Sequence, residues 1–232
     1  MSSDNTIYYL THDDIKDEKI LFDHIYPDEN TNYYFSDDFS KEFYIKLAKA
    51  GFISTTTFYN DKQYLLPEIQ FEYSILDFED LHISKKVEKL IRSQNFIFSV
   101  NKNFDEVLVR LDEYHKPNWL TDEYKFLLKG IQEANYLDFQ VKSFEILDKD
   151  TKEIIAAEVG YFTNNIYTSL TGFSSKEKKY NNYGKLQLVL LALYLQKINC
   201  SFWNLGHPYM QYKFDLGAKM YSRNNFLKRW YE

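Results

Sequence analysis

Apolar segments in the second half of the chain constrain its fold most, because only short turns and one long helix separate them. Four have strand character and one is helical: residues 139–147, 154–162, 166–171 and 201–205, and the helix 185–197. Tight turns are expected at Asp148–Lys152 and at Asn164-Asn165. Hairpin-linked strands that end in a β-α-β unit predict an α/β (α+β) protein with a mixed sheet flanked by helices.

The first third of the chain is expected to be separate from this body. Residues 1–32 are acidic and polar without a regular period, and indicate loosely structured edge material. Apolar residues then recur at helical spacing up to Gly51, which ends a serine-capped helix, and residues 63–76 have strand character. We expect a small acidic N-terminal α/β domain over residues 1–80 and a larger domain over residues 81–232.

Shorter patterns predict the remaining elements of the body. Ser84 is a cap for a short basic helix, and Thr121 is a cap for a second helix. The expected elements are helices over 82–93, 104–114, about 121–134 and from 226 onward, and a strand over 96–100.

Charge is distributed unevenly along the chain. Residues 1–80 carry 6 Lys and Arg against 17 Asp and Glu, whereas residues 174–232 carry 10 against 3, within a total of −6. The basic end is either a solvated face or a surface for phosphate groups, because clustered Lys and Arg attract polyanions and release counterions. Composition leaves both interpretations open.

Composition excludes several other classes of protein. A hydrophobic fraction of 44% can build a sizeable core, which disordered and collagen-like chains cannot. The single Cys200 forms no internal disulfide, and the five histidines lack metal-ligand spacing, so we expect no metal and no cofactor. Because Met1–Leu10 lacks the features of a signal peptide and no apolar run approaches ~18 residues, we expect a cytoplasmic monomer.

Three stretches in order carry a family resemblance. Residues 35–52 hold the helix that ends at a glycine turn, and Leu81-His-Ile-Ser84 and Asn118-Trp-Leu-Thr121 are short signatures. Residues 166–218 comprise a strand, a polar loop, an apolar helix, a strand and the terminal Leu216-Gly-Ala218. Together they resemble the leucyl/phenylalanyl-tRNA–protein transferases, which combine a small N-terminal domain with a body of the GNAT (N-acetyltransferase-like) fold.

The resemblance implies transfer of an amino acid from a charged tRNA to the N-terminal α-amine of an acceptor protein, as in N-degron tagging. Three positions depart from the family pattern. Asn204 stands where the family has an aspartate that is proposed to organise proton transfer, and Leu170 stands where it has a glutamate. Glu158 stands where the family has an apolar lining of its amino-acid pocket.

The reaction needs a positioned amine, a polarised ester carbonyl and a proton acceptor. The α-amine titrates near ~8, so a useful fraction is neutral, and positioning supplies much of the rate. We take Asn204 and His207 as candidate catalytic residues, beside a cleft expected at residues 203–207. The Asn204 amide can orient an amine or donate to an oxyanion but cannot be a base, whereas His207 can shuttle a proton. Alternatively, His207 is a loop residue and the tRNA adenosine hydroxyl relays the proton.

The donor amino acid and adenosine are expected in an aromatic-lined pocket with a few polar groups. Candidates in the matched segments are Trp119, Glu158, Tyr167, Ser169, Thr171, Phe173 and Ser174. Aromatic rings suit stacking on adenine, although in a chain with 19% aromatic residues any single ring can equally belong to the core.

Glu158 is the most informative of these candidates. Alternation along the strand puts it beside Ile154 and Ala156, where a buried unpaired carboxylate is costly. It therefore either faces solvent or awaits a cation, which in a donor pocket is an arginyl or lysyl side chain or the α-ammonium. We hypothesise a donor that is basic or otherwise altered, rather than leucine or phenylalanine.

The tRNA backbone is expected to contact four lysines near the polar loop, Lys176, Lys178, Lys179 and Lys185, with Lys85, Lys86 and Arg92 as a second contact. Two other functions compete with this interpretation. An acyl-CoA N-acyltransferase needs a pyrophosphate-binding loop, but residues 180–185 offer one glycine only. A catalytically idle module that binds aminoacyl-tRNA or protein N-termini is favoured by Asn204.

Overall fold

The structure is a computed structural model that describes residues 8–232, and the chain divides into two compact units. One unit contains the chain up to Tyr73 together with residues 119–130 and 221–232. The other contains residues 74–118 and 131–220. Each unit is thus assembled from separated stretches of sequence. The predicted boundary near residue 80 stays a prediction.

The first unit contains short helices and two small sheets. Its elements are β1 (Tyr8–Tyr9), α1 (His12–Lys16), α2 (Glu18–Ile20), a π-helix (Leu21–Ile25), β2 (Tyr34–Phe35), α3 (Lys41–Lys49), β3 (Ile53–Tyr59), β4 (Lys62–Glu68) and α9 (Arg223–Tyr231). Ser40 caps α3, and Gly51 follows it with a φ of 83°, as expected. The prediction of loose structure was wrong for residues 12–25, which form helices.

Two signals for this unit were missed in the sequence. Thr11 and Asp14 form a capping box that starts α1: the Thr11 backbone N–H lies 2.8 Å from Asp14 Oδ2. Residues 53–59 are rich in β-branched side chains and form β3, which pairs with β4 in an antiparallel hairpin. Asn60 and Asp61 make its two-residue turn with positive φ angles of 48° and 59°.

Arg223, the first residue of α9, organises the N-terminal part of this unit. Its side chain is buried, and its guanidinium donates to the backbone carbonyls of Ile69 at 2.7 Å, Gln70 at 3.1 Å and Thr31 at 3.0 Å. The predicted start at residue 226 was three residues late, because Ser222 caps the helix. A charge buried among carbonyls is stabilised by these hydrogen bonds.

Three elements straddle the division of the chain, namely β5 (Glu72–Leu76), α6 (Asp122–Ala134) and β11 (Lys219–Ser222). The rest of the second unit comprises α4 (Lys85–Ser93), β6 (Phe96–Val100), α5 (Phe104–Tyr114), β7 (Phe139–Asp148), β8 (Ile154–Thr163), β9 (Ile166–Ser174), α7 (Tyr183–Lys197), β10 (Trp203–Asn204) and α8 (Gln211–Asp215), with short 3₁₀ turns at 78–80 and 178–180. Residues 63–76, predicted as one strand, are two strands, β4 and β5, interrupted at residues 69–71.

A seven-stranded sheet forms the centre of the second unit. Its order is β11-β5-β10-β9-β8-β7-β6. Strands β6 to β9 are antiparallel neighbours, whereas β10 runs parallel to β9 and antiparallel to β5. The predicted mixed α/β sheet with flanking helices is confirmed. The strand expected over 201–205 is shorter, since only Trp203 and Asn204 pair.

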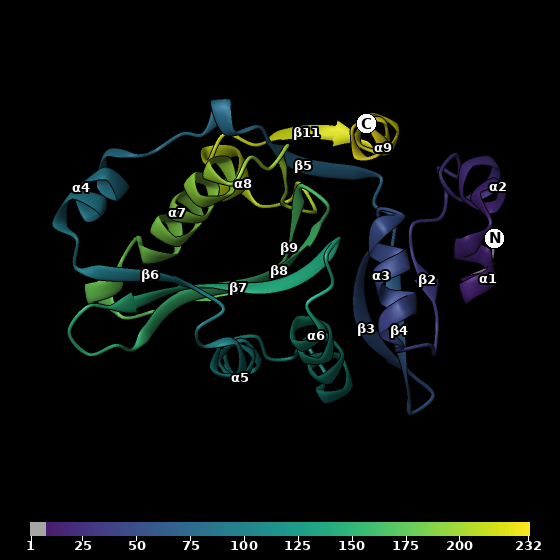
Figure 1. The fold of residues 1–232 in the computed structure, drawn as a ribbon, viewed down its shortest axis with the longest axis horizontal. Helices are drawn as coiled ribbons and strands as arrows, with labels where there is room; N and C mark the ends of the chain where they lie inside the picture. Colours follow the sequence, from purple (N-terminus) through teal and green to yellow (C-terminus); the bar gives the residue numbers. More distant parts are fainter. Residues whose placement is uncertain (1–7) are drawn as a thin grey trace, which may run out of the picture. The chain divides into compact units, whose positions relative to one another are not determined.

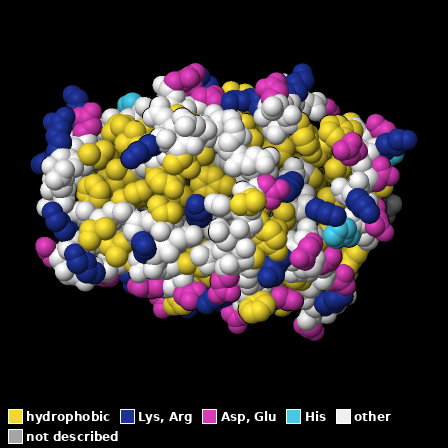
Figure 2. Space-filling view, viewed as in Figure 1, with side chains coloured by type: hydrophobic (Ala, Val, Ile, Leu, Met, Phe, Trp, Pro, Cys, Tyr) yellow, Lys and Arg dark blue, Asp and Glu magenta, His cyan; other side chains and the backbone are white. Residues whose placement is uncertain are grey.

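Helices cover both faces of this sheet (Figure 1): α7 crosses one face and α5 packs on the other. Leu186, Leu191 and Leu195 of α7 are fully buried in the core beneath it. Figure 2 shows hydrophobic side chains gathered over α4, β6 and α7, where Phe98 and Tyr194 are only partly buried. Within residues 8–232, no helix combines the length and hydropathy needed to cross a membrane.

Candidate functional site

Strands β9 and β10 are paired for two residues only and then separate. Tyr167 lies opposite Trp203 and Thr168 lies opposite Asn204, and no described strand pairs with β9 on that side beyond this point. Burial changes at the same place, because residues 166–168 are buried whereas residues 169–174 are half-buried. The second half of β9 is therefore an accessible strand edge.

A polar cluster surrounds Glu158 at the start of this edge. The Glu158 side chain is 4% exposed, so the alternative in which it faces solvent is excluded. Its Oε1 accepts hydrogen bonds from the Tyr167 hydroxyl at 3.0 Å and from Ser169 Oγ at 2.7 Å. Ser169 Oγ in turn accepts one from Trp203 Nε1 at 2.8 Å. Three residues predicted from the sequence, Glu158, Tyr167 and Ser169, thus meet in space.

Burial controls the ionisation of this cluster. Desolvation raises the pKa of Glu158 to about 7, although the hydrogen bonds from Ser169 and Tyr167 and the nearby Lys213 oppose the rise. Lys213 is also buried, and its Nζ donates to the backbone carbonyls of Leu205 at 2.5 Å and His207 at 2.6 Å. Its pKa falls to about 8 because burial outweighs the attraction of Glu158. Sequence reasoning missed Lys213, which nothing in its surrounding sequence distinguishes from a surface lysine.

Asn204 lies on the opposite side of the strand from Trp203 and faces away from Glu158. It is 1% exposed, its Nδ2 lies 3.5 Å from Thr168 Oγ1, and its Oδ1 accepts from the Gly206 N–H at 3.0 Å. Residues 203–206 are buried, so this segment does not itself form the expected cleft. His207 is half-buried, and its ring stacks on Tyr209 at a centroid distance of 4.9 Å.

The remaining donor-side candidates do not gather around Glu158. Phe173 pairs with Ala157, and Thr171 with Val159, on the other face of the sheet. Ser174 pairs with Ala156 and shares the face of Glu158. Trp119 belongs to the first unit, where its ring makes an edge contact with Tyr124 at 5.3 Å.

The accessible half of β9 has neighbours on α5 and just after it that sequence reasoning also missed. His115 Nε2 lies 2.8 Å from the Gly172 carbonyl oxygen. Phe173 lies under the Arg110 guanidinium, with 5.9 Å from Cζ to the ring centroid, and beside Tyr114. No signal in the sequence links these residues of α5 to the strand, because the contact is purely tertiary.

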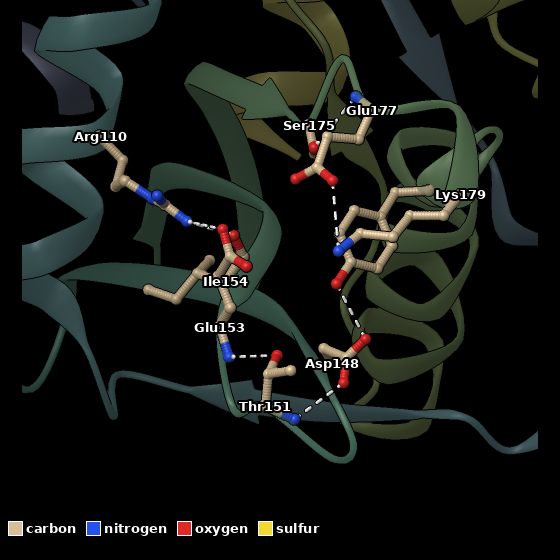
Figure 3. Close-up of polar contacts among 9 residues, drawn as sticks. Arg110, Asp148, Thr151, Glu153, Ile154, Ser175, Glu177 and Lys179 are labelled. Carbon is tan, nitrogen blue, oxygen red and sulfur yellow. Dashed lines mark hydrogen bonds and ion pairs between the residues drawn. The ribbon is translucent and has the colours of Figure 1, made fainter.

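The polar loop after β9 carries three exposed lysines, Lys176, Lys178 and Lys179. Tyr180 anchors this loop, since its hydroxyl donates to Asp148 at 2.9 Å, on the turn between β7 and β8 (Figure 3). The Asp148 carboxylate also accepts from the Thr151 N–H at 2.9 Å. These hydrogen bonds hold the lysine loop against the turn between β7 and β8.

The four predicted tRNA-binding lysines differ in their local contacts. Lys179 pairs with Glu177 at 3.2 Å (Figure 3), and Lys176 lies over the Tyr114 ring at 4.8 Å. Lys185 pairs with Asp215 at 3.2 Å and lines a separate cavity of about 350 Å³ between α4, α7 and α8.

In the described residues, no group of three or more His, Cys, Asp or Glu side chains could hold a metal ion.

A family model described as leucyl/phenylalanyl-tRNA protein transferase matches residues 75–231, well over half of the chain. The protein is thus an aminoacyltransferase by class, and the chain belongs to the leucyl/phenylalanyl-tRNA protein transferase family. Enzymes of this family transfer an amino acid from an aminoacyl-tRNA donor to an acceptor protein. A search of curated proteins finds no match to the chain.

Solved structures with partial similarity include a GCN5-related glucosamine N-acetyltransferase region of a fungal multi-domain GH3 β-N-acetylglucosaminidase. It has 11% identity and a TM-score of 0.47, and the alignment covers 82% of this chain and 24% of that one. L-PGS from Bacillus licheniformis has 13% identity and a TM-score of 0.43, covering 75% and 51%. FemX has 8% identity and a TM-score of 0.49, covering 84% and 71%. The chain thus spans about a quarter and about half of the first two proteins.

Proposed function

We propose that this chain transfers an aminoacyl group at the accessible edge of β9. The donor ester would lie along residues 169–174, with its tRNA directed toward the lysine loop that follows directly in the chain. The observation that carries this proposal is the separation of β9 from β10 after Thr168. Beyond that point no described strand pairs with this edge, although His115 contacts the Gly172 carbonyl, and half-buried side chains lie beside a basic loop. Strand edges bind extended groups through their free backbone donors and acceptors.

The proposed reaction is attack of the acceptor's neutral α-amine on the ester carbonyl. The amine titrates near ~8, and positioning both reactants removes much of the entropic barrier. His207 is half-buried beside the buried segment and is our candidate for a proton shuttle in direct contact with substrate. Asn204 remains a candidate to orient the site, and its hydrogen bond to the Gly206 N–H supports a role in shaping the backbone there.

Recognition of the tRNA would depend on Lys176, Lys178, Lys179 and Lys185. The first three are exposed on the anchored loop, which supports contacts with backbone phosphates rather than with bases. Thr171, Phe173 and Ser174, on the half-buried part of β9, remain proposed contacts of the donor amino acid and adenosine. Tyr167 is buried and is proposed to act through Glu158, and Trp119 stays a prediction from the sequence. We further propose that the protein acts as a cytoplasmic monomer.

The partners of Glu158 bear on which amino acid is donated. Glu158 already has two hydrogen-bond donors and feels the positive charge of Lys213. These groups provide the stabilisation that a basic donor side chain would otherwise have to supply. The geometry therefore does not require a basic donor, and neutral donors belong in the same assay.

The test is a transfer assay with leucyl-, phenylalanyl-, arginyl- and lysyl-tRNA and peptides that differ in their first residue. Mass spectrometry of the peptide should show one added residue, which deacylated tRNA does not supply. An acetylated peptide N-terminus should block the product. Binding of charged tRNA without any product would support the idle binding module, and stabilisation by coenzyme A would support the acyl-CoA enzyme.

A further inference from the structure

Ser169 occupies a distinctive position in the proposed site. It is the first residue of β9 past the last pair with β10, it is half-buried, and its hydroxyl contacts the buried Glu158. A serine hydroxyl has one proton to donate and two lone pairs to accept. The proton goes to Glu158, and Trp203 Nε1 donates to one lone pair, so one acceptor position is left.

We propose that Ser169 and Glu158 form a proton relay that, in place of the His207 shuttle considered above, supplies the proton acceptor which Asn204 cannot be. Ser169 would touch the reacting amine, and Glu158 would act behind it as the group that stores the proton. The inference rests on the proposed function, since it concerns the proton released in aminoacyl transfer.

The relay accounts for every atom of the transfer. The acceptor nitrogen attacks the ester carbonyl carbon, and a C–N bond forms. The nitrogen then gives one proton to Ser169 Oγ while Ser169 gives its own proton to Glu158. As the C–O bond to the ribose breaks, that proton returns through Ser169 to the ribose oxygen. Glu158 is then a carboxylate again, and the products are the extended peptide and deacylated tRNA.

The groups around Glu158 fit this role. Tyr167 on β9 donates to it, Tyr212 and Lys213 on α8 interact with it electrostatically, and Gln187 is the polar residue that α7 contributes. A pKa of about 7 lets the carboxylate accept a proton near neutral pH and return it, which is the property that an acid–base catalyst needs. Lys213 stabilises the charged form and Tyr167 holds the side chain in place.

A pH series of single-turnover transfer by the wild type and the Glu158→Gln variant tests the relay. The acceptor amine titrates identically with both enzymes, so the ratio of their rates isolates Glu158. The ratio should rise about tenfold between about pH 6 and about pH 8, following the ionisation of Glu158, and exceed about 100 at the upper end. Ser169→Ala, which keeps the carboxylate, should lose the same pH-dependent part of the rate, and Ser169→Thr should restore some of it.

Glu145→Gln is the matched control, since Glu145 is a buried glutamate of the same sheet that accepts hydrogen bonds from Ser99 and Ser143. It pairs with Ala157 and so lies on the face opposite Glu158. Its rate ratio to the wild type should be independent of pH. A pH-independent ratio for both Glu158→Gln and Ser169→Ala would overturn the relay while leaving transfer intact. Absence of transfer by the wild type from every charged tRNA would instead overturn the proposed function, and the relay with it.

Discussion

Gly160 on β8 leaves the space that the Tyr167 hydroxyl on β9 occupies. A Cβ at position 160 would overlap with that hydroxyl and with the Thr168 carbonyl oxygen, both far inside contact distance. The absence of a side chain at Gly160 therefore allows Tyr167 to reach Glu158. The register of the two strands shifts at the same place, between Val159 and Gly160.

Gly160→Ala should lower the free energy of unfolding by about 1–3 kcal/mol, because the added methyl group forces strand and ring apart in a packed core. Denaturant unfolding of the variant measures this loss. Gly130→Ala is the control: Gly130 lies in α6, where an added Cβ meets only the flexible Lys41 side chain at 3.4 Å. That variant should be neutral or more stable by up to about 1 kcal/mol, as helix propensity predicts. Equal effects at the two positions would contradict this account.

The stability of the protein should depend on pH through Glu158. Its pKa is raised to about 7 in the folded state, so the folded protein binds the proton more tightly than the unfolded chain. The resulting stabilisation is complete below the unfolded value and is lost as pH rises through about 7. Melting temperatures of wild type and Glu158→Gln between about pH 4 and about pH 8 should show a decline in the wild type that the variant lacks. Parallel curves would show that Glu158 is not the group responsible.

Asn204→Asp should destabilise the protein rather than repair its resemblance to the family. Asn204 is 1% exposed, and its Nδ2 is close to Thr168, so an aspartate would lose this donor and bury a charge. The expected loss is about 2 kcal/mol or more, with part of it recovered at low pH as the new carboxyl is protonated. Asn204→Ala gives the comparison, because it removes both hydrogen bonds without adding charge. A more stable and more active aspartate variant would show that the segment is more open than its burial indicates.

Much of the sheet could be predicted from the sequence, whereas the site could be predicted only in part: Glu158, Tyr167 and Ser169 were candidates, but their contacts were not. Strands β7 and β8 and the turns around them follow from local alternation and from residues such as Asn164, which takes a positive φ of 53°. The hydrogen bonding and the pKa of Glu158 depend instead on Trp203, which donates to Ser169, and on Lys213. Both lie about fifty residues further along the chain. Burial of a charged side chain is decided by such tertiary neighbours, and alternation indicates only its face.

The lysine loop should carry the salt dependence of tRNA binding. Replacing Lys176, Lys178 and Lys179 one at a time with alanine should reduce the slope of log affinity against log salt by about one for each phosphate that the variant no longer neutralises. Lys197→Ala is the control, because Lys197 ends α7, about 20 Å along the helix from its first residue. Tyr180→Phe, which frees the loop from Asp148, should weaken binding with little change of slope. If the slope of log affinity against log salt is unchanged in all three lysine variants, the tRNA binds to another surface of the protein.

Removing the positive charge of Lys213 should move the pH dependence of transfer. Its ammonium lowers the pKa of Glu158, so Lys213→Gln should raise that pKa. The midpoint is read from the ratio of the rate of each Lys213 variant to that of the same variant carrying Glu158→Gln, and for Lys213→Gln it should shift above about 7. The glutamine amide can still donate to one of the two carbonyls that Lys213 holds, at Leu205 and His207, which limits the structural damage. Lys213→Arg keeps the charge and should leave the midpoint in place even if the rate falls. A midpoint that moves equally in both variants would attribute the effect to packing, because Lys213→Arg keeps the positive charge that Lys213→Gln removes.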